Sequence, residues 1–236
     1  MNQETQTEQT FNVIFIVDES GSMETMTKKV YNPDNSFTEI KEPVTAITGF
    51  IENYKKENSS NNTTFSFTFF NSIVRELPDN KEITNSDYNP GGMTALHDAI
   101  CQTINKKLEK NQNATNTILI IITDGEENSS YIYNLKDTQK TIAKVERENK
   151  WKVIFLGANI DVMKEGSSMN IQRERTCEYD QTVAGNLNVI LRSASIDVAN
   201  YTHNVSLGIE DDLQLNMPKL ELNEDCGEVP LFLQHS

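Results

Sequence analysis

The segment VIFIVDESGSM, residues 13–23, joins an unbroken apolar run to a polar loop and decides which fold the chain adopts. An apolar run without alternation is typical of a strand that is buried on both faces, as in parallel sheets covered by helices. Asp18, Ser20 and Ser22 follow it at every second position, and Gly21 allows a tight bend between the serines. The segment therefore predicts a central strand whose carboxyl end carries several oxygen-bearing side chains.

Apolar runs alternate with amphipathic segments along the rest of the chain. Further strands are predicted at residues 65–69, 73–77, 118–122 and 153–156, with 73–77 as the antiparallel hairpin partner of 65–69. Helices are predicted from Pro43, after residues 91–94, through Leu135, and from Val183 to Tyr201. This order predicts a Rossmann-like, doubly wound α/β domain with a mostly parallel central sheet, one antiparallel edge strand and helices on both faces.

The domain is expected to span residues 9–202. Residues 1–8 are predicted to be a flexible N-terminus, and residues 203–236 an acidic, loosely ordered C-terminal tail. A polar stretch at residues 25–36 lengthens the connection between the first polar loop and the helix that follows it.

Charge and hydropathy restrict the classes of partner. The chain of 236 residues has 21 Lys and Arg against 35 Asp and Glu, a formal net charge of −14. This balance disfavours nucleic acid and anionic membranes as partners. There is no N-terminal signal pattern, and no apolar run approaches the roughly 18 residues of a membrane span. A cytoplasmic protein is therefore expected.

Three polar clusters follow predicted strands or precede a predicted helix. They contain Asp18, Ser20 and Ser22, then Thr94, then Asp124. Ligands of doubly wound sheets bind outside the carboxyl ends of the strands, so we expect the clusters to converge. Their ligand atoms are all oxygens, which suits Mg²⁺, with Mn²⁺ or Ca²⁺ as further possibilities. Three neutral hydroxyls and two carboxylates would leave such an ion able to bind another acid.

The segments DESGSM, GGMTAL and ITDGEEN, in this order, resemble the metal-site segments of von Willebrand factor A (vWA) domains. The resemblance covers roughly residues 9–201. It implies a metal-ion-dependent adhesion site (MIDAS) in which Ser20, Ser22 and Thr94 offer hydroxyls to the ion, while Asp18 and Asp124 act largely through water. It also implies a non-catalytic protein whose partner supplies a Glu or Asp carboxylate to the metal. Residues 25–36 depart from the family pattern, and we hypothesise that they influence which partner can approach.

Other interpretations remain open at this stage. Asp18 or Ser20 alone could cap a helix. Glu19, Glu126 and Glu127 are interpreted as solvated loop charges rather than as further ligands. A magnesium-dependent phosphoryl-transfer hydrolase of the haloacid-dehalogenase type would need Asp where Ser20 stands. In a third interpretation the metal only stabilises the loops. The sequence defines no oligomeric state.

Overall fold

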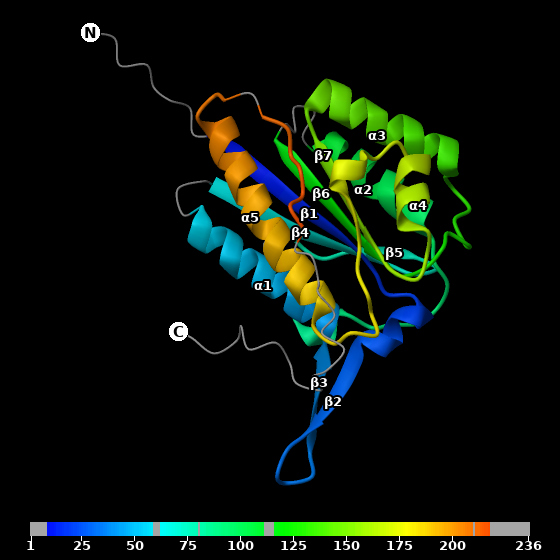
Figure 1. The fold of residues 1–236 in the computed structure, drawn as a ribbon. Coiled ribbons are helices and arrows are strands. Elements are labelled where there is room, and N and C mark those ends of the chain that lie inside the picture. The colour runs from blue at the N-terminus through cyan, green and yellow to red at the C-terminus, as the bar shows by residue number, and fades with distance from the viewer. Residues whose placement is uncertain (1–8, 59–61, 80, 111–115, 210, 218–236) are drawn as a thin grey trace.

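A six-stranded sheet forms the centre of the molecule in the computed structural model, which describes residues 9–58, 62–79, 81–110, 116–209 and 211–217 (Figure 1). Its strands are β1 (Thr10–Asp18), β4 (Asn62–Phe70), β5 (Val74–Glu76), β6 (Thr117–Thr123), β7 (Lys152–Gly157) and β8 (Thr176–Glu178). They lie in the order β5-β4-β1-β6-β7-β8, and each pair is parallel except β4 with β5. The predicted sheet type is therefore confirmed.

Helices cover both faces of this sheet (Figure 1). One face packs against α1 (Glu42–Glu57) and α5 (Asn186–Ser206), and the other against α2 (Leu96–Lys110), α3 (Leu135–Asn149) and α4 (Val162–Ser168). Alternate residues of β1 enter the two cores: Phe15 packs on the α1 side and Ile14 on the α2 side. Both faces of β1 are buried for this reason, which explains its continuous apolar run.

The strand order reverses beside β1. From β1 the chain continues to β4 on one side, and it later enters β6 on the other side. The carboxyl ends of β1 and β6, which are Asp18 and Thr123, therefore lie at the switch point of the sheet, where doubly wound domains bind ligands.

Several elements differ from the prediction. The stretch that was expected to be a polar connection forms a hairpin of β2 (Thr27–Tyr31) and β3 (Phe37–Lys41), which projects from the body at the bottom of Figure 1. Three short 3-10 helices were also not predicted: η1 (Gly21–Met26), η2 (Asn85–Asp87) and η3 (Arg173–Arg175). Nor were α4 and β8. Val183 precedes α5, because Gly185 with φ of 81° forms the N-cap of that helix.

The C-terminal part of the chain also differs from the expectation. The boundary placed at residue 202 falls inside α5, which continues to Ser206. Residues 211–217 then pack against the body: Leu213 is buried in the core, and the Leu215 amide donates to the Glu174 carbonyl at 2.9 Å. Residues 1–8 and 218–236 lie outside the described residues. Within the described part, no helix has the length and apolar character needed to cross a membrane.

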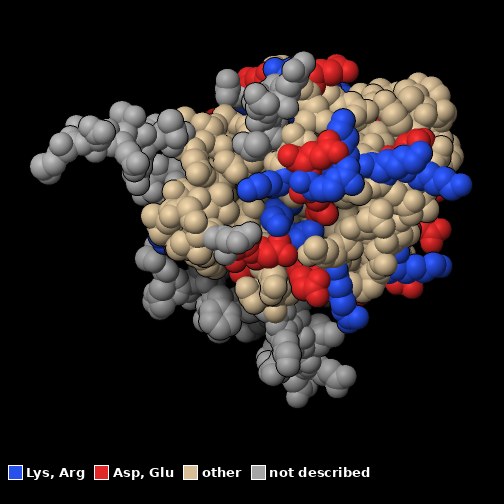
Figure 2. Space-filling model, turned by 90° about the horizontal axis from the view of Figure 1, so that it is seen from above, with Lys and Arg blue, Asp and Glu red and all other residues tan. Residues whose placement is uncertain are grey.

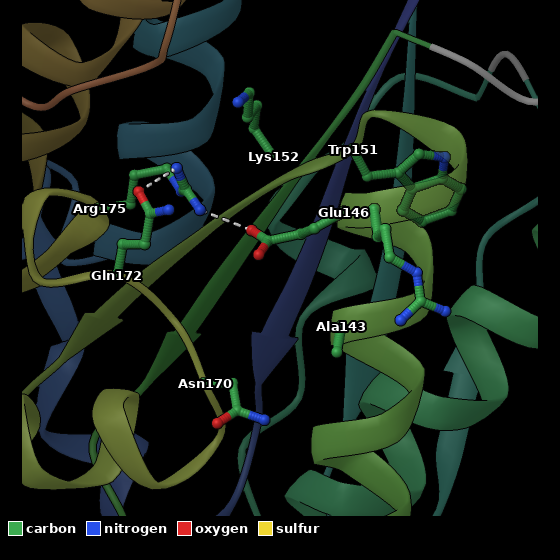
Figure 3. Close-up of a pocket in the computed structure, with 8 residues that line it drawn as sticks. Ala143, Glu146, Trp151, Lys152, Asn170, Gln172 and Arg175 are labelled. Atoms are coloured by element: carbon green, nitrogen blue, oxygen red, sulfur yellow. Dashed lines mark hydrogen bonds and ion pairs between the residues drawn. The ribbon is translucent and has the colours of Figure 1, made fainter.

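Arg175 holds this segment to the sheet beside a cavity of about 420 Å³ (Figure 3). The buried guanidinium donates to the Val153 carbonyl at 3.1 Å, to Glu146 at 2.6 Å and to Asp212 at 3.3 Å. The neighbouring Lys152 also pairs with Asp212, at 2.5 Å.

Lys152 is the first residue of β7, so the cavity lies at the opposite end of the sheet from the three polar clusters. Figure 2, seen from above, shows basic and acidic side chains side by side on that end of the molecule.

We expect Arg175→Met to lower the free energy of unfolding by about 3 kcal/mol, because it leaves Glu146 without its buried partner. Urea denaturation measures the change. Arg147→Met is the matched control, since Arg147 is exposed and its one ion pair among the described residues is with the adjacent Glu148; it should cost less than about 1 kcal/mol. Equal effects of the two substitutions would contradict the structural role of Arg175.

Candidate metal centre

Backbone hydrogen bonds join the first polar loop to the loop that precedes α2. The Gly21 amide donates to the Gly92 carbonyl at 3.1 Å, and the Gly91 amide donates to the Glu19 carbonyl at 2.8 Å. Gly92 has φ of 83°, and a Cβ there would come within 3.0 Å of the Ser72 hydroxyl. The close approach of the two loops therefore depends on a glycine at this position.

The loop after β6 is joined to Thr94 in the same way. The Thr94 amide donates to the Asn128 side-chain oxygen at 2.9 Å, and the Asn128 amide returns a bond to the Thr94 carbonyl at 3.0 Å. A Cβ on Gly125 would lie 3.1 Å from the Thr94 hydroxyl and 3.7 Å from the Ser22 hydroxyl. Both hydroxyls thus lie next to Gly125, so the loops that carry Ser22, Thr94 and Asp124 meet at one place.

The side chains of three predicted ligands, Ser20, Ser22 and Asp124, form a hydrogen-bonded chain at this place. The Ser20 and Ser22 hydroxyl oxygens are 3.0 Å apart, and the Ser22 hydroxyl donates to Asp124 Oδ1 at 2.6 Å. The other carboxylate oxygen, Asp124 Oδ2, is buried and has no hydrogen-bond partner among the described residues. A buried carboxylate oxygen without a partner is costly, so this atom marks a position suited to a cation.

Asp18 lies beneath this chain and is fully buried. Its two carboxylate oxygens accept hydrogen bonds from the Ser20 amide at 2.7 Å and from the Thr123 hydroxyl at 2.6 Å. Burial nevertheless raises the pKa of Asp18 to about 6, and the negative charge of Asp124 adds to the rise. Burial also raises the pKa of Asp124 above its ordinary value. Two carboxyl groups are therefore held where ionisation is unfavourable unless a positive charge is nearby.

Glu19 and Glu127 are not the solvated charges that were expected. Glu19 is buried. Its carboxylate pairs with the Arg75 guanidinium at 2.9 Å and accepts a hydrogen bond from the Asn89 amide at 3.2 Å. Glu127 accepts from the amides of His97 at 3.0 Å and of Ser130 at 2.7 Å, so it ties the third loop to the start of α2. Glu126 is exposed, as predicted for it.

Several supporting residues were not identified from the sequence. Thr123, Asn128 and Arg75 each hold a predicted site residue or its loop. Asp98 is a fourth: it is buried and accepts the amides of Tyr131 at 3.2 Å and Tyr133 at 2.8 Å. The position of Thr123 directly before Asp124 was the one available signal, because a hydroxyl at the end of β6 must lie beside the end of β1 in a parallel sheet.

No group of three or more His, Cys, Asp or Glu side chains is placed to hold a metal ion in the part of the chain that the structure describes. His97 and Cys101 both contact the Thr138 hydroxyl, at 3.2 Å and 3.5 Å, and so pack α2 against α3. The cluster at the switch point differs from such groups because three of its five side chains carry hydroxyls. Its chemistry suits a hard cation that keeps much of its charge.

These features define a doubly wound α/β domain with a hydroxyl- and carboxylate-bearing site at its switch point. The chain belongs to the von Willebrand factor type A domain family, whose sequence model matches residues 12–184. A comparison with curated protein sequences finds no match.

Solved structures with a similar fold come from distant proteins. The PilB minor pilin from Streptococcus sanguinis aligns with a TM-score of 0.52 and 11% identity, over 88% of this chain and 64% of the pilin chain. Its D319A mutant gives 0.54 and 12%, over 86% and 65%. The SpRpn10 VWA domain gives 0.50 and 10%, over 81% and 94%. The chain thus covers less than two thirds of either pilin chain, and at these identities the likeness concerns the fold.

The raised pKa of Asp18 predicts a distinctive pH dependence in metal-free protein. Protonated Asp18 stabilises the fold below about pH 4, and this contribution is lost as the pH rises through about 6. Relative to Asp18→Asn, the native chain in chelator should lose about 3 kcal/mol of unfolding free energy between about pH 4 and pH 7. Denaturant titrations of both proteins across this range test it. A difference that does not vary with pH would contradict the raised pKa.

Proposed function

We propose that Asp18, Ser20, Ser22, Thr94 and Asp124 hold Mg²⁺ and that the bound ion binds a Glu or Asp carboxylate of a partner protein. The observation that carries this proposal is the buried, unpartnered Asp124 Oδ2 beside the connected hydroxyls of Ser20 and Ser22. Members of the vWA family commonly mediate protein–protein interactions through a metal site at this position.

Each residue has a distinct part in the proposed site. The hydroxyls of Ser20, Ser22 and Thr94 supply neutral ligands, and Asp124 supplies a negative one. Both carboxylate oxygens of Asp18 accept hydrogen bonds, from Ser20 and Thr123, so Asp18 orients the loop. Its negative charge, beneath the proposed ion, balances part of the ion's positive charge. An ion held mainly by neutral oxygens keeps enough positive charge to attract an acidic side chain. Mn²⁺ or Ca²⁺ would fit the same set of oxygens.

The observations favour this function over a hydrolase. A phosphoryl-transfer enzyme of the haloacid-dehalogenase type needs an exposed Asp nucleophile, whereas Asp18 is fully buried with both carboxylate oxygens in hydrogen bonds. The family, moreover, typically contains interaction modules rather than enzymes. A purely stabilising role for the metal is the other alternative, and it predicts metal binding without a metal-dependent partner.

Calorimetric titration with Mg²⁺ tests the metal site. The native chain should bind one ion, and the ion should raise the unfolding free energy by about 2.7 kcal/mol at a hundred times the dissociation constant. Asp124→Asn keeps the shape of the side chain but removes its charge, so it should weaken binding at least tenfold. Glu126→Ala changes an exposed acid two residues away and should bind as the native chain does. Equal binding by both variants would contradict the proposed ligand.

Selection of short peptides from a random display library on the immobilised chain tests the acid-binding step. Peptides retained in Mg²⁺ and released by chelator should carry an Asp or Glu, and its replacement by Asn or Gln should abolish binding. Retained peptides that bind equally well in chelator, or that need no acidic residue, would contradict the proposed function. Metal binding together with no metal-dependent peptide would favour the stabilising role.

A further inference from the structure

The β2–β3 hairpin continues directly from the proposed metal loop. The 3-10 helix η1 begins at Gly21, between Ser20 and Ser22, and its C-cap Thr27 is the first residue of β2. The other end of the hairpin is fixed through Lys41, whose amide donates to Asn85 Oδ1 at 3.3 Å and whose ammonium donates to the Tyr88 carbonyl. The Tyr88 hydroxyl in turn donates to the Asp18 carbonyl at 2.9 Å. The base of the hairpin is therefore tied to the metal loop on both sides.

The tip of the hairpin is also well formed. The Asn32 amide donates to the Ser36 carbonyl at 2.8 Å, and Asn35 adopts φ of 64°. The Ser36 amide and hydroxyl both donate to Asp34 Oδ1. This turn fixes the register in which Tyr31 pairs with Phe37. The hairpin is thus an ordered projection rather than a loose connection.

Apolar side chains on this projection are exposed to an unusual degree. Val30 is 46%, Tyr31 71%, Phe37 49% and Ile40 40% exposed. Beyond its base, which contacts η1, η2 and the start of α1, no described element covers the hairpin (Figure 1). A two-stranded ribbon has little stability of its own in water, and clustered exposed apolar residues mark interaction sites.

A lysine accompanies the apolar residues on each face of the ribbon. Directly paired residues share a face, so Lys29, Tyr31 and Phe37 lie on one face, with Glu39 directly opposite Lys29. The Lys29 ammonium sits 4.6 Å from the Phe37 ring centre. The other face carries Lys28, Val30 and Ile40. Neither lysine forms an ion pair with another described residue. Glu39 offsets the charge of Lys29, whereas Lys28 has no acidic residue on its own face of the ribbon.

We infer that the β2–β3 hairpin is a second docking surface for the acidic partner that the proposed metal site binds. The occupant is an acidic protein segment that runs along β2, with apolar side chains over Tyr31 and Phe37 on one face and a carboxylate that reaches Lys28 on the other. This inference rests on the proposed function, because the same partner segment would continue from the metal-bound acid onto the hairpin. At about 3.3 Å per residue the ribbon extends about 17 Å, which a segment of about five to eight residues can follow. Aromatic residues beside a positive charge are typical anchors of protein interfaces.

The test uses the magnesium-dependent peptides selected on the native chain. Their affinities are measured by fluorescence anisotropy against Tyr31→Ser/Phe37→Ser, Lys28→Glu/Lys29→Glu and Asp124→Asn. Lys140→Glu/Lys144→Glu is the matched control, since it makes the same charge change at exposed positions of α3. Melting temperatures of all variants establish that each remains folded.

The two hairpin variants should each weaken peptide binding at least tenfold, while the α3 control leaves it unchanged. The hairpin variants and the α3 control should all still bind Mg²⁺, whereas Asp124→Asn should bind it poorly. Magnesium-dependent binding that the hairpin variants do not alter would overturn the hairpin inference and leave the metal function standing. Binding that survives chelator and Asp124→Asn would refute the proposed function, and the inference with it. A dimer of the native chain that Tyr31→Ser/Phe37→Ser converts to a monomer would identify a second copy as the occupant and would also overturn the inference.

Discussion

The burial of two carboxylates at the switch point of the sheet is the constraint on which the rest of the structure depends. Asp18 and Asp124 end up beside each other because β1 and β6 are parallel neighbours whose carboxyl ends share one edge. Their ionised forms are disfavoured there, as the raised pKa values of both groups indicate. Folding can place charges in such a position only if hydrogen bonds, or a cation, offset the loss of solvent.

The surrounding residues partly offset that loss and leave one position open. The Thr123 hydroxyl and the Ser20 amide satisfy Asp18, and the Ser22 hydroxyl satisfies one oxygen of Asp124. Polar residues farther out hold the three loops in register: buried Glu19 pairs with Arg75, Glu127 accepts from an α2 amide, and Asn128 bonds Thr94. These contacts order the loops without the help of a ligand, which reduces the entropy that binding must overcome. Hydrogen bonds of Lys41 and Tyr88 connect the hairpin base to the same network.

Local sequence pattern predicted the sheet and the convergence of the site, because both follow from the order of apolar strands. The continuous runs at residues 13–17 and 118–122 identify buried parallel strands, and the polar residues at their ends must then meet. The hairpin was missed because its apolar residues face solvent, so the stretch lacks the alternation that a half-buried strand produces. Contacts such as Glu19 with Arg75 and Arg175 with Asp212 join residues far apart in the sequence, and no local signal records them. The packing of residues 211–217 depends on the second of these contacts and was missed for that reason.

Diffraction from crystals grown with Mn²⁺, recorded at a wavelength where manganese scatters anomalously, tests the central claim most directly. The account predicts one anomalous peak in contact with the hydroxyls of Ser20, Ser22 and Thr94, and no such peak in crystals of Asp124→Asn. A folded native chain with no peak at these residues, or with its only peak elsewhere, would contradict the proposal that the switch-point carboxylates are there to hold a metal ion.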